Sequence, residues 1–175
     1  RPECHATRIT HDATGKVDGV EYRDASGNLH KQAARVVCLA GNSIESPRLL
    51  LLSASSLHPD GLANSSGQVG RNYMRHTTGS VYAIFDKPVR MWRGTTMAGI
   101  VQDEARHDPS RGFVGGYELE TLSLGLPCMA AFLNPGGWGR GFTTALDHYE
   151  RMAGMLIVGE DMPQADNRVT LSETK

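Results

Sequence analysis

Two short segments of small and polar residues have the composition of a ligand site. The first, Ala40–Ser43, directly follows the apolar run Val36–Ala40. A short apolar run bounded by turn residues predicts a strand that is buried on both faces, and Gly41 and Asn42 tolerate the unusual backbone angles of a tight turn. Because ligands of open α/β sheets bind beyond the carboxyl ends of the strands, the backbone of this turn is a candidate ligand site. Most such strand–turn–helix units, however, are scaffold and touch no ligand.

The second segment, Gly70–His76, closes a long loop that begins near Ser53 and is rich in Ser, Asn, Gly and Pro. Long loops in compact domains tend to be functional or mobile. His76 could change its charge near neutral pH. A histidine at the end of a segment is more often an ordinary hydrogen-bonded residue, so both interpretations of His76 stay open.

Several other kinds of chemistry have no counterpart in this sequence. It contains neither the Gly-x-Ser-x-Gly elbow of serine hydrolases nor the His-Glu-x-x-His motif of zinc enzymes. Cys4, Cys38 and Cys128 are too few and too widely spaced for a disulfide framework or a metal cluster. Cys38 lies inside the apolar run and is expected to be a buried, inert thiol. Glu160 and Asp161 are neighbours, so on a strand they would point to opposite faces and could not act as an acid–base pair.

The composition limits the partners and the size of the fold. A chain of 175 residues forms one large domain or two small ones, and its formal net charge of -1 implies no attraction to nucleic acid. It lacks an apolar stretch of the ~18 residues needed to span a bilayer. Because the chain starts without Met and stops near Lys175, where a strand ends, it is expected to be an internal segment of a longer protein.

Three short strands and one helix are predicted to position the first segment. The strands are Cys4–Thr10, Lys16–Arg23 and Leu29–Ala33, joined by turns rich in Asp and Gly into a β-meander, with a bulge at Gly19. The helix is predicted to begin with Ser46 as N-cap and Pro47 at the first helical position, and four leucines from Leu49 to Leu52 follow.

Beyond Thr77 the pattern changes to short strands separated by Gly, Pro and Asp clusters, which predicts a mostly antiparallel sheet with one face toward solvent or a ligand. The apolar spacing over Phe142–Met152 predicts a single helix. The predicted strands are Val81–Phe85, Thr96–Gln102, Phe113–Thr121, Cys128–Leu133, Met155–Gly159 and Arg168–Leu171.

The run Ala40–Ser53 resembles the second signature of the glucose-methanol-choline (GMC) flavin oxidoreductases. Asn42 and Ala54 stand where many members have Gly, and the Asn form resembles the branch of bacterial gluconate and sorbitol dehydrogenase flavoproteins. Gly70–His76 resembles the Gly-x-Asn-x-x-x-His segment of the same family, and its distance from Ser53 also fits. The signature positions are filled by Ser43, Ser46, Pro47, Leu49, Leu50 and Ser53.

This resemblance implies a fold that combines an α/β part with an α+β part. Residues 1–78 would be the end of an FAD-binding dinucleotide fold, in which a β-meander precedes the last parallel strand and a helix. Residues 79–175 would form part of a substrate-binding domain with a mostly antiparallel sheet. The family's Gly-x-Gly-x-x-Gly turn for the pyrophosphate is absent here.

The resemblance also implies FAD as the cofactor. By that resemblance the backbone near Cys4 and His5 would contact the adenine, although the His5 side chain could equally be an ordinary strand residue. No residue matches the family's catalytic His and its His or Asn partner, so this segment alone is expected to be inactive. The cofactor-binding residues implied are Cys4, His5, Ala40, Gly41, Asn42, Ser46, Asn72 and His76.

The implied reaction is oxidation of a CH–OH group of a sugar, sugar acid or polyol, with hydride transfer to the flavin. The electron acceptor could be oxygen, a quinone or a cytochrome, and the compartment could be the cytoplasm or periplasm of a bacterium. An alternative from another class is a non-catalytic, β-rich carbohydrate-binding module, in which Trp92 and Trp138 stack on a sugar. A purely structural subunit without a small ligand is the third hypothesis.

Overall fold

The computed structural model describes residues 1–125, 128–129 and 135–173. The chain folds into two compact units. The first comprises Arg1–Met74 with Pro163–Lys175, and the second comprises Arg75–Met162. The sequence predicts a different kind of division, between a cofactor-binding part that ends at residue 78 and a substrate-binding part that follows. This functional division stays a prediction.

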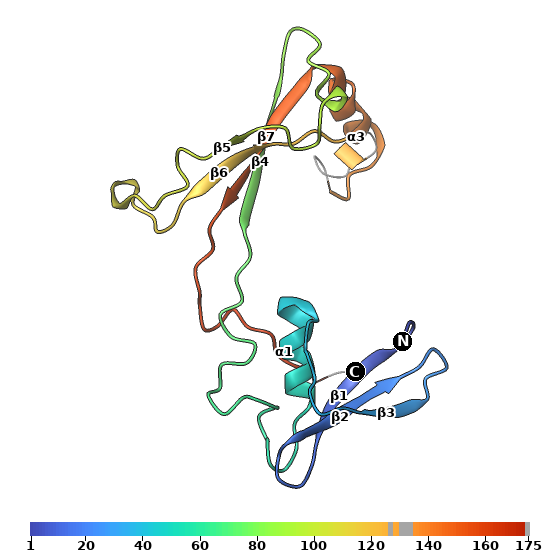
Figure 1. The fold of residues 1–175 in the computed structure, drawn as a ribbon. Coiled ribbons are helices and arrows are strands. Elements are labelled where there is room, and N and C mark those ends of the chain that lie inside the picture. Colours follow the sequence, from blue (N-terminus) through green and yellow to red (C-terminus); the bar gives the residue numbers. More distant parts are fainter. Residues whose placement is uncertain (126–127, 130–134, 174–175) are drawn as a thin grey trace. The chain divides into compact units, whose positions relative to one another are not determined.

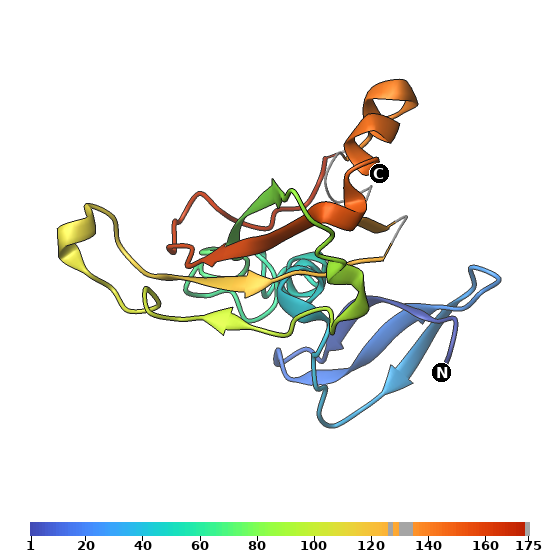
Figure 2. The same ribbon diagram turned by 90° about the horizontal axis from the view of Figure 1, so that it is seen from above.

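A three-stranded antiparallel sheet opens the first unit. Its strands are β1 (His5–His11), β2 (Val17–Arg23) and β3 (Leu29–Ala33), in the order β1-β2-β3, and they lie side by side in both ribbon views (Figures 1 and 2). The predicted β-meander is therefore confirmed. The pairing passes from Thr10 with Gly19 to His11 with Val17, so one residue of β2 is left over beside Gly19, where a bulge was predicted.

The turn between β2 and β3 is organised by the carboxylate of Asp24. Its Oδ1 accepts hydrogen bonds from the backbone N–H groups of Ser26 and Asn28, each at 2.9 Å. Its Oδ2 lies 2.7 Å from Nε2 of His30 on β3. The hydrogen bond from His30, followed by that from the Asn28 backbone, lowers the pKa of Asp24 to about 2.

This turn is expected to open in acid. A carboxyl whose folded-state pKa is depressed stabilises the fold above its unfolded pKa, which is about 3.9 for Asp, and loses that contribution as the pH falls. For Asp24 the loss falls between about pH 4 and the folded value of about 2. A proton NMR titration should show the Ser26 and Asn28 amides shifting together with Asp24 in this window, and the D24N variant should lack the transition. Titration of Asp24 near pH 4 would contradict the prediction.

In the structure of this chain, the run Val36–Ala40 does not form the predicted buried strand. It pairs with no strand in the described part of the chain, Val36 is 76% exposed, and Cys38 is exposed instead of buried. Val37 and Leu39 are half-buried while their neighbours are exposed, which is the alternation of an extended segment. A parallel strand is buried by neighbouring strands and covering helices, and this run has only one side covered.

Helix α1 spans Asn42–Leu52 and begins before Ser46, the predicted N-cap. Pro47 lies inside the helix and not at its first position, so that prediction is also wrong. The four leucines are half-buried or exposed, and the most buried residues of this unit lie around the end of the helix and on the meander: Ile9, Tyr22, Ser53 and Leu62.

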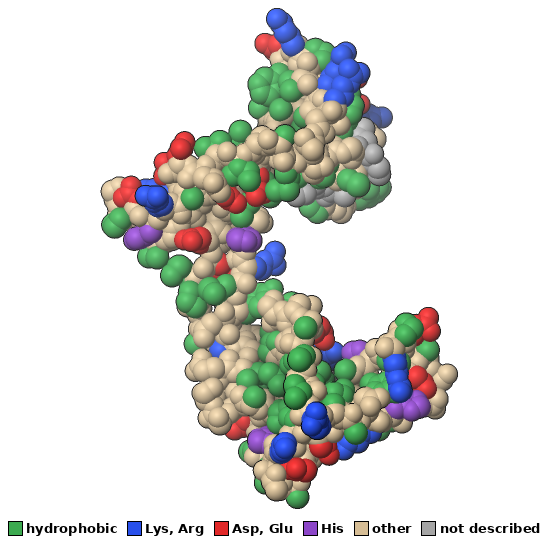
Figure 3. Space-filling model, viewed as in Figure 1, with side chains coloured by type: hydrophobic (Ala, Val, Ile, Leu, Met, Phe, Trp, Pro, Cys, Tyr) green, Lys and Arg blue, Asp and Glu red, His purple; other side chains and the backbone are tan. Residues whose placement is uncertain are grey.

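The second unit contains an antiparallel sheet of four strands, which confirms the predicted sheet type. The strands are β4 (Thr77–Ile84), β5 (Ile100–Val101), β6 (Tyr117–Thr121) and β7 (Met152–Gly159), in the order β4-β7-β6-β5. Strands β5 and β6 are shorter than the predicted Thr96–Gln102 and Phe113–Thr121. Hydrophobic side chains stand at the surface of this unit, including Val81 at 64% and Ile100 at 53% exposed (Figure 3).

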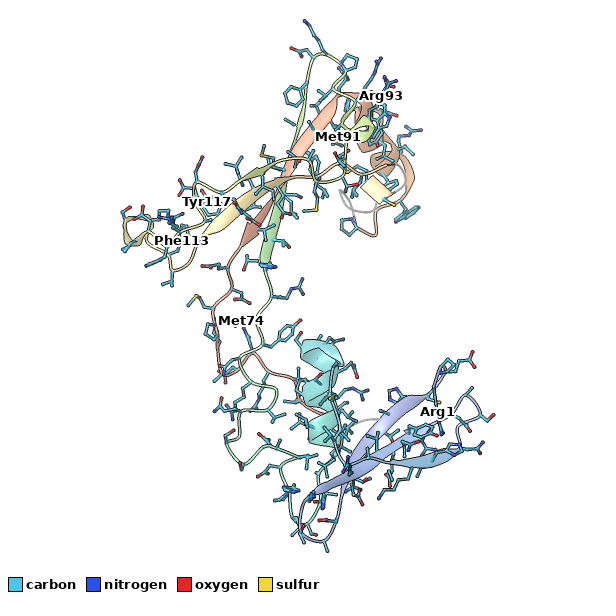
Figure 4. The ribbon with its side chains drawn as sticks, in the orientation of Figure 1. Arg1, Met74, Met91, Arg93, Phe113 and Tyr117 are labelled. Atoms are coloured by element: carbon cyan, nitrogen blue, oxygen red, sulfur yellow. The ribbon has the colours of Figure 1, made fainter. Side chains whose placement is uncertain are left out.

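The loop between β5 and β6 is fixed by Arg111, whose Nη1 lies 2.7 Å from Oε2 of Glu104. The guanidinium also lies over the rings of Phe113 and Tyr117, 5.2 and 5.9 Å from their centroids, and Figure 4 labels Phe113 on the loop and Tyr117 where β6 begins. An arginine that meets both a carboxylate and aromatic faces orders the backbone around it. The residues predicted as one long strand are therefore partly used to build this loop.

The helical part of the second unit is split in two. Helix α3 covers Gly139–Leu146, and a 3₁₀ turn, η3 (Tyr149–Arg151), leads into β7, so the single predicted helix Phe142–Met152 is wrong in its bounds. Two further 3₁₀ turns are η1 (Met91–Arg93) and η2 (Pro109–Arg111). Among the residues described, no helix is long and apolar enough to cross a membrane. The predicted strand Cys128–Leu133 lies largely outside the described residues.

Candidate cofactor site

The turn before α1 is closed by two side chains that accept hydrogen bonds from backbone N–H groups. Asn42 has a left-handed φ of 79°, and its Oδ1 accepts hydrogen bonds from the N–H groups of Ile44 (2.9 Å) and Glu45 (3.0 Å). The Gly41 N–H donates to Oγ of Ser46 at 3.0 Å. The Asn42 side chain thus satisfies two of the first donors of the helix and performs the role that the sequence assigned to Ser46.

Replacing Asn42 with alanine should destabilise this turn twice over, because the cap is lost and a left-handed backbone is forced on a β-carbon. We expect Asn42→Ala to lower the free energy of unfolding by about 2 kcal/mol. Asn42→Gly removes only the cap and should cost about 1 kcal/mol or less. Urea denaturation of the two variants measures both values. Equal losses would show that the left-handed conformation of Asn42 carries no strain.

Beside this turn lies an open pocket that brings the two predicted segments together. Ser43 and Pro47 line one side, and Gly70–Met74 lines the other, around about 540 Å³ of empty space. Pro47 has no N–H to pair with the Ser43 carbonyl four residues earlier, so the helix lacks one hydrogen bond at the wall of the pocket. Asn72 is exposed here with a left-handed φ of 58°.

The Gly70–Met74 wall is held by the segment that returns after the second unit. The Val169 N–H donates to the Gly70 carbonyl and the Tyr73 N–H donates to the Asn167 carbonyl, each at 2.8 Å. No strand is assigned over the predicted Arg168–Leu171, because only these two bonds form and a regular ladder does not continue. The returning segment therefore positions Asn72 without forming the predicted strand.

The other predicted cofactor residues occupy separate places. His5 is exposed at the start of β1, where it pairs with Arg23, and Cys4 beside it is half-buried with a free thiol. Ala40 is exposed at the end of the extended run. His76 is exposed and belongs to the second unit, where it lines a pocket with Tyr117 and two glutamates. The roles of all these residues as cofactor ligands stay predictions.

Sequence reasoning predicted Asn72 but missed the contribution of Pro47, Arg71, Tyr73 and Met74 to the same pocket. The signal was present, since Pro47 stands four residues after Ser43, but its meaning depends on where the helix begins. Among the residues described, no group of three or more His, Cys, Asp or Glu side chains could hold a metal ion. Ala40 and Asn42 are exposed residues in a turn with small side chains, which fits an organic cofactor.

Comparison with known proteins agrees with this kind of site. Residues 1–78 match the profile of the GMC oxidoreductase family. The chain is 35% identical over 170 residues to 2-methyl-1,2-propanediol dehydrogenase from Mycolicibacterium austroafricanum, a match that covers 92% of this chain and 31% of that protein. It is 28% identical over 167 residues to the gluconate 2-dehydrogenase flavoprotein of Pantoea cypripedii, covering 89% of this chain and 27% of that protein.

A structural likeness extends over the same region. The fold matches formate oxidase of Aspergillus oryzae with a TM-score of 0.57 and 16% sequence identity, over 91% of this chain and 34% of that one. The chain thus spans about a third or less of the length of these relatives. Residues 1–78 match the GMC oxidoreductase family, and the chain is similar to a segment of the propanediol dehydrogenase. The matches agree with the family that the two motifs predicted.

Proposed function

We propose that this chain is a segment of a flavoenzyme that oxidises a CH–OH group of a polyol, sugar or sugar acid. Bound FAD would supply the chemistry of such a reaction by accepting a hydride. Residues 1–78 would contribute the last part of the flavin domain, and residues 79–175 part of the substrate domain. The observation that carries the proposal is the match of residues 1–78 to the family, combined with a turn in which Ala40 and Asn42 are exposed.

In this proposal the residues of the first unit bind and orient the cofactor. The backbone at Cys4 and His5 would meet the adenine, and Ala40, Gly41 and Asn42 would present main-chain groups beyond the extended run. Asn72 supplies a neutral amide at the pocket wall. Ser46 acts indirectly, because its hydroxyl already accepts from the Gly41 N–H and so holds the turn. His76, a residue of the second unit, would be a further cofactor residue.

The exposed run Val36–Ala40 is explained by the same proposal. An apolar extended segment with 76% of Val36 exposed is poorly placed in water and well suited to pair within a parallel sheet. In the proposed flavin domain this run would be the last parallel strand, with its neighbours supplied by the remainder of the protein. The turn at Gly41 would then lie at the carboxyl end of that sheet, where ligands bind.

The substrate class rests on the names of the relatives. One is a dehydrogenase of 2-methyl-1,2-propanediol, another is a gluconate 2-dehydrogenase flavoprotein, and a third is the large subunit of a fructose dehydrogenase from Gluconobacter japonicus, 36% identical over 83 residues, 47% of this chain and 15% of that protein. A small diol, a sugar acid and a ketose share a CH–OH group beside another oxygen-bearing carbon. We propose such a hydroxylated small molecule as substrate, with oxygen, a quinone or a cytochrome as electron acceptor.

The test is the intact mass of the protein purified from its natural source, with an absorbance scan of the same sample. We expect a mass well above the 19.0 kDa of this chain and flavin bands near ~450 nm that bleach when a diol or sugar acid is added without oxygen. A colourless protein of 19.0 kDa would overturn the proposal of a flavoenzyme and favour the hypothesis of a carbohydrate-binding module. Trp92 is a poor sugar platform because it already stacks on Tyr149 at 4.8 Å, although Trp138 is 89% exposed.

A further inference from the structure

Ser53, the last residue of the helix signature, is completely buried and joins two distant parts of the first unit. Its Oγ donates to the Leu49 carbonyl at 2.6 Å within α1, and it accepts the backbone N–H of Ile9 on β1 at 2.9 Å. One hydroxyl thus uses both its donor and an acceptor position. Replacing Ser53 with an apolar residue would leave the Ile9 N–H unpaired.

The need for this bond follows from the topology of the sheet. β1 is an edge strand of the meander, so some of its N–H groups face away from β2 and have no strand to pair with. Ile9 is only 3% exposed, and water therefore does not serve its N–H. A buried donor without a partner costs about 1–3 kcal/mol, and the Ser53 hydroxyl removes that cost.

Two neighbouring contacts extend the junction along β1. Nη2 of Arg8 donates to the Ala54 carbonyl at 2.7 Å, and Nε2 of His11 lies 2.7 Å from Oγ of Ser55. Three consecutive residues after α1 therefore contact three residues of β1. We call these three contacts the clamp.

We propose that Ser53 is a positioning residue for the cofactor, an inference that rests on the proposed function. The clamp fixes α1, which begins at Asn42 directly after Gly41, on β1, which begins at His5 directly after Cys4. The two groups of predicted ligands are then held at one separation before FAD arrives. If the clamp opens, only a fraction of molecules has the binding geometry, and the apparent affinity falls by that fraction.

The test compares Ser53→Thr with Ser53→Val in the natural protein. Threonine and valine have nearly the same volume, so any crowding in the buried site is common to both, and only threonine keeps the hydroxyl. The measurement is the rate of flavin release, followed as the rise of free-flavin fluorescence. We expect release to be about tenfold faster for Ser53→Val than for Ser53→Thr, the size of one lost buried hydrogen bond.

A general loss of stability is controlled with Met152→Ala, which empties a buried position of the second unit and should leave the release rate unchanged. If Ser53→Val does not fold, Arg8→Met removes a contact of the clamp that is only partly buried and should accelerate release in the same direction. Equal release rates for the Thr and Val variants, with a lower melting temperature for Val, would overturn the positioning role and leave the proposed function intact. A natural protein that holds no flavin would overturn both.

Discussion

Gly154→Ala is expected to lower the free energy of unfolding by about 3 kcal/mol, at the upper end of the cost of overpacking. Gly154 lies in β7, which pairs with β4 on one side and β6 on the other. A β-carbon at this position would stand 2.3 Å from Cδ1 of Tyr82 and 2.4 Å from the carbonyl oxygen of Val81. The Tyr82 ring could rotate, but the Val81 carbonyl belongs to the adjoining strand and could yield only by separating β4 from β7.

Gly79→Ala is the matched control, because Gly79 lies in β4 of the same sheet and nothing stands within 4 Å of its virtual β-carbon. That variant should change the stability by less than about 1 kcal/mol, and a small gain is expected from the lower entropy of its unfolded chain. Urea denaturation of the two variants, with amide hydrogen exchange of β4 and β7, measures the difference. Equal stabilities for both alanine variants would show that the Tyr82 ring does not lie over Gly154.

The parts of the fold that the sequence predicted are those that local patterns determine. The strands β1–β3 could be predicted because turns that begin with Asp and contain Gly separate short alternating segments, and Asp24 shows how such a turn is made by one side chain. The antiparallel sheet of the second unit was predictable for the same reason. The lengths of its strands were not, because the loop around Arg111 takes residues that have strand-like patterns.

What the sequence could not predict depends on contacts between distant residues. Val36–Ala40 has the composition of a buried strand, but burial comes from neighbours and not from the run itself. The helix start was misplaced because Ser46 and Pro47 form a good local capping pattern. The structure instead combines a left-handed Asn42 with the Ser46 hydroxyl, and this alternative depends on backbone angles that composition does not fix.

In the candidate site, too, local motifs could be predicted and contacts between distant residues could not. The two segments were recognised separately from their motifs, and their meeting in one pocket follows from the contact of Gly70–Met74 with Ser43 and Pro47. The role of Ser53 was hidden because its partner, Ile9, lies 44 residues earlier in the chain. Signature residues therefore need not touch the ligand. The presence of Ser53 and Ser46 in the signature is explained by the backbone N–H groups whose hydrogen bonds they accept.

Substitution of Gly70, in the Gly70–Met74 wall of the pocket, is expected to destabilise the fold about as much as substitution of Gly154. Gly70 has a φ of +83°, and a β-carbon on it would stand 2.6 Å from the Val169 carbonyl oxygen. Alanine here would adopt an unfavourable backbone angle and also push away the returning segment that donates to the Gly70 carbonyl. We expect Gly70→Ala to lower the free energy of unfolding by about 3 kcal/mol, the sum of left-handed strain and overpacking.

Gly67→Ala separates these two contributions, since Gly67 also has a positive φ of +67° but nothing within 4 Å of its virtual β-carbon. It should cost about 1 kcal/mol, the strain alone. Amide hydrogen exchange at Tyr73 and Val169 should accelerate strongly in Gly70→Ala and remain slow in Gly67→Ala, because only the first variant disrupts the two bonds between these segments. If both variants exchange alike, the returning segment does not hold the pocket wall, and Asn72 must be positioned by its own loop.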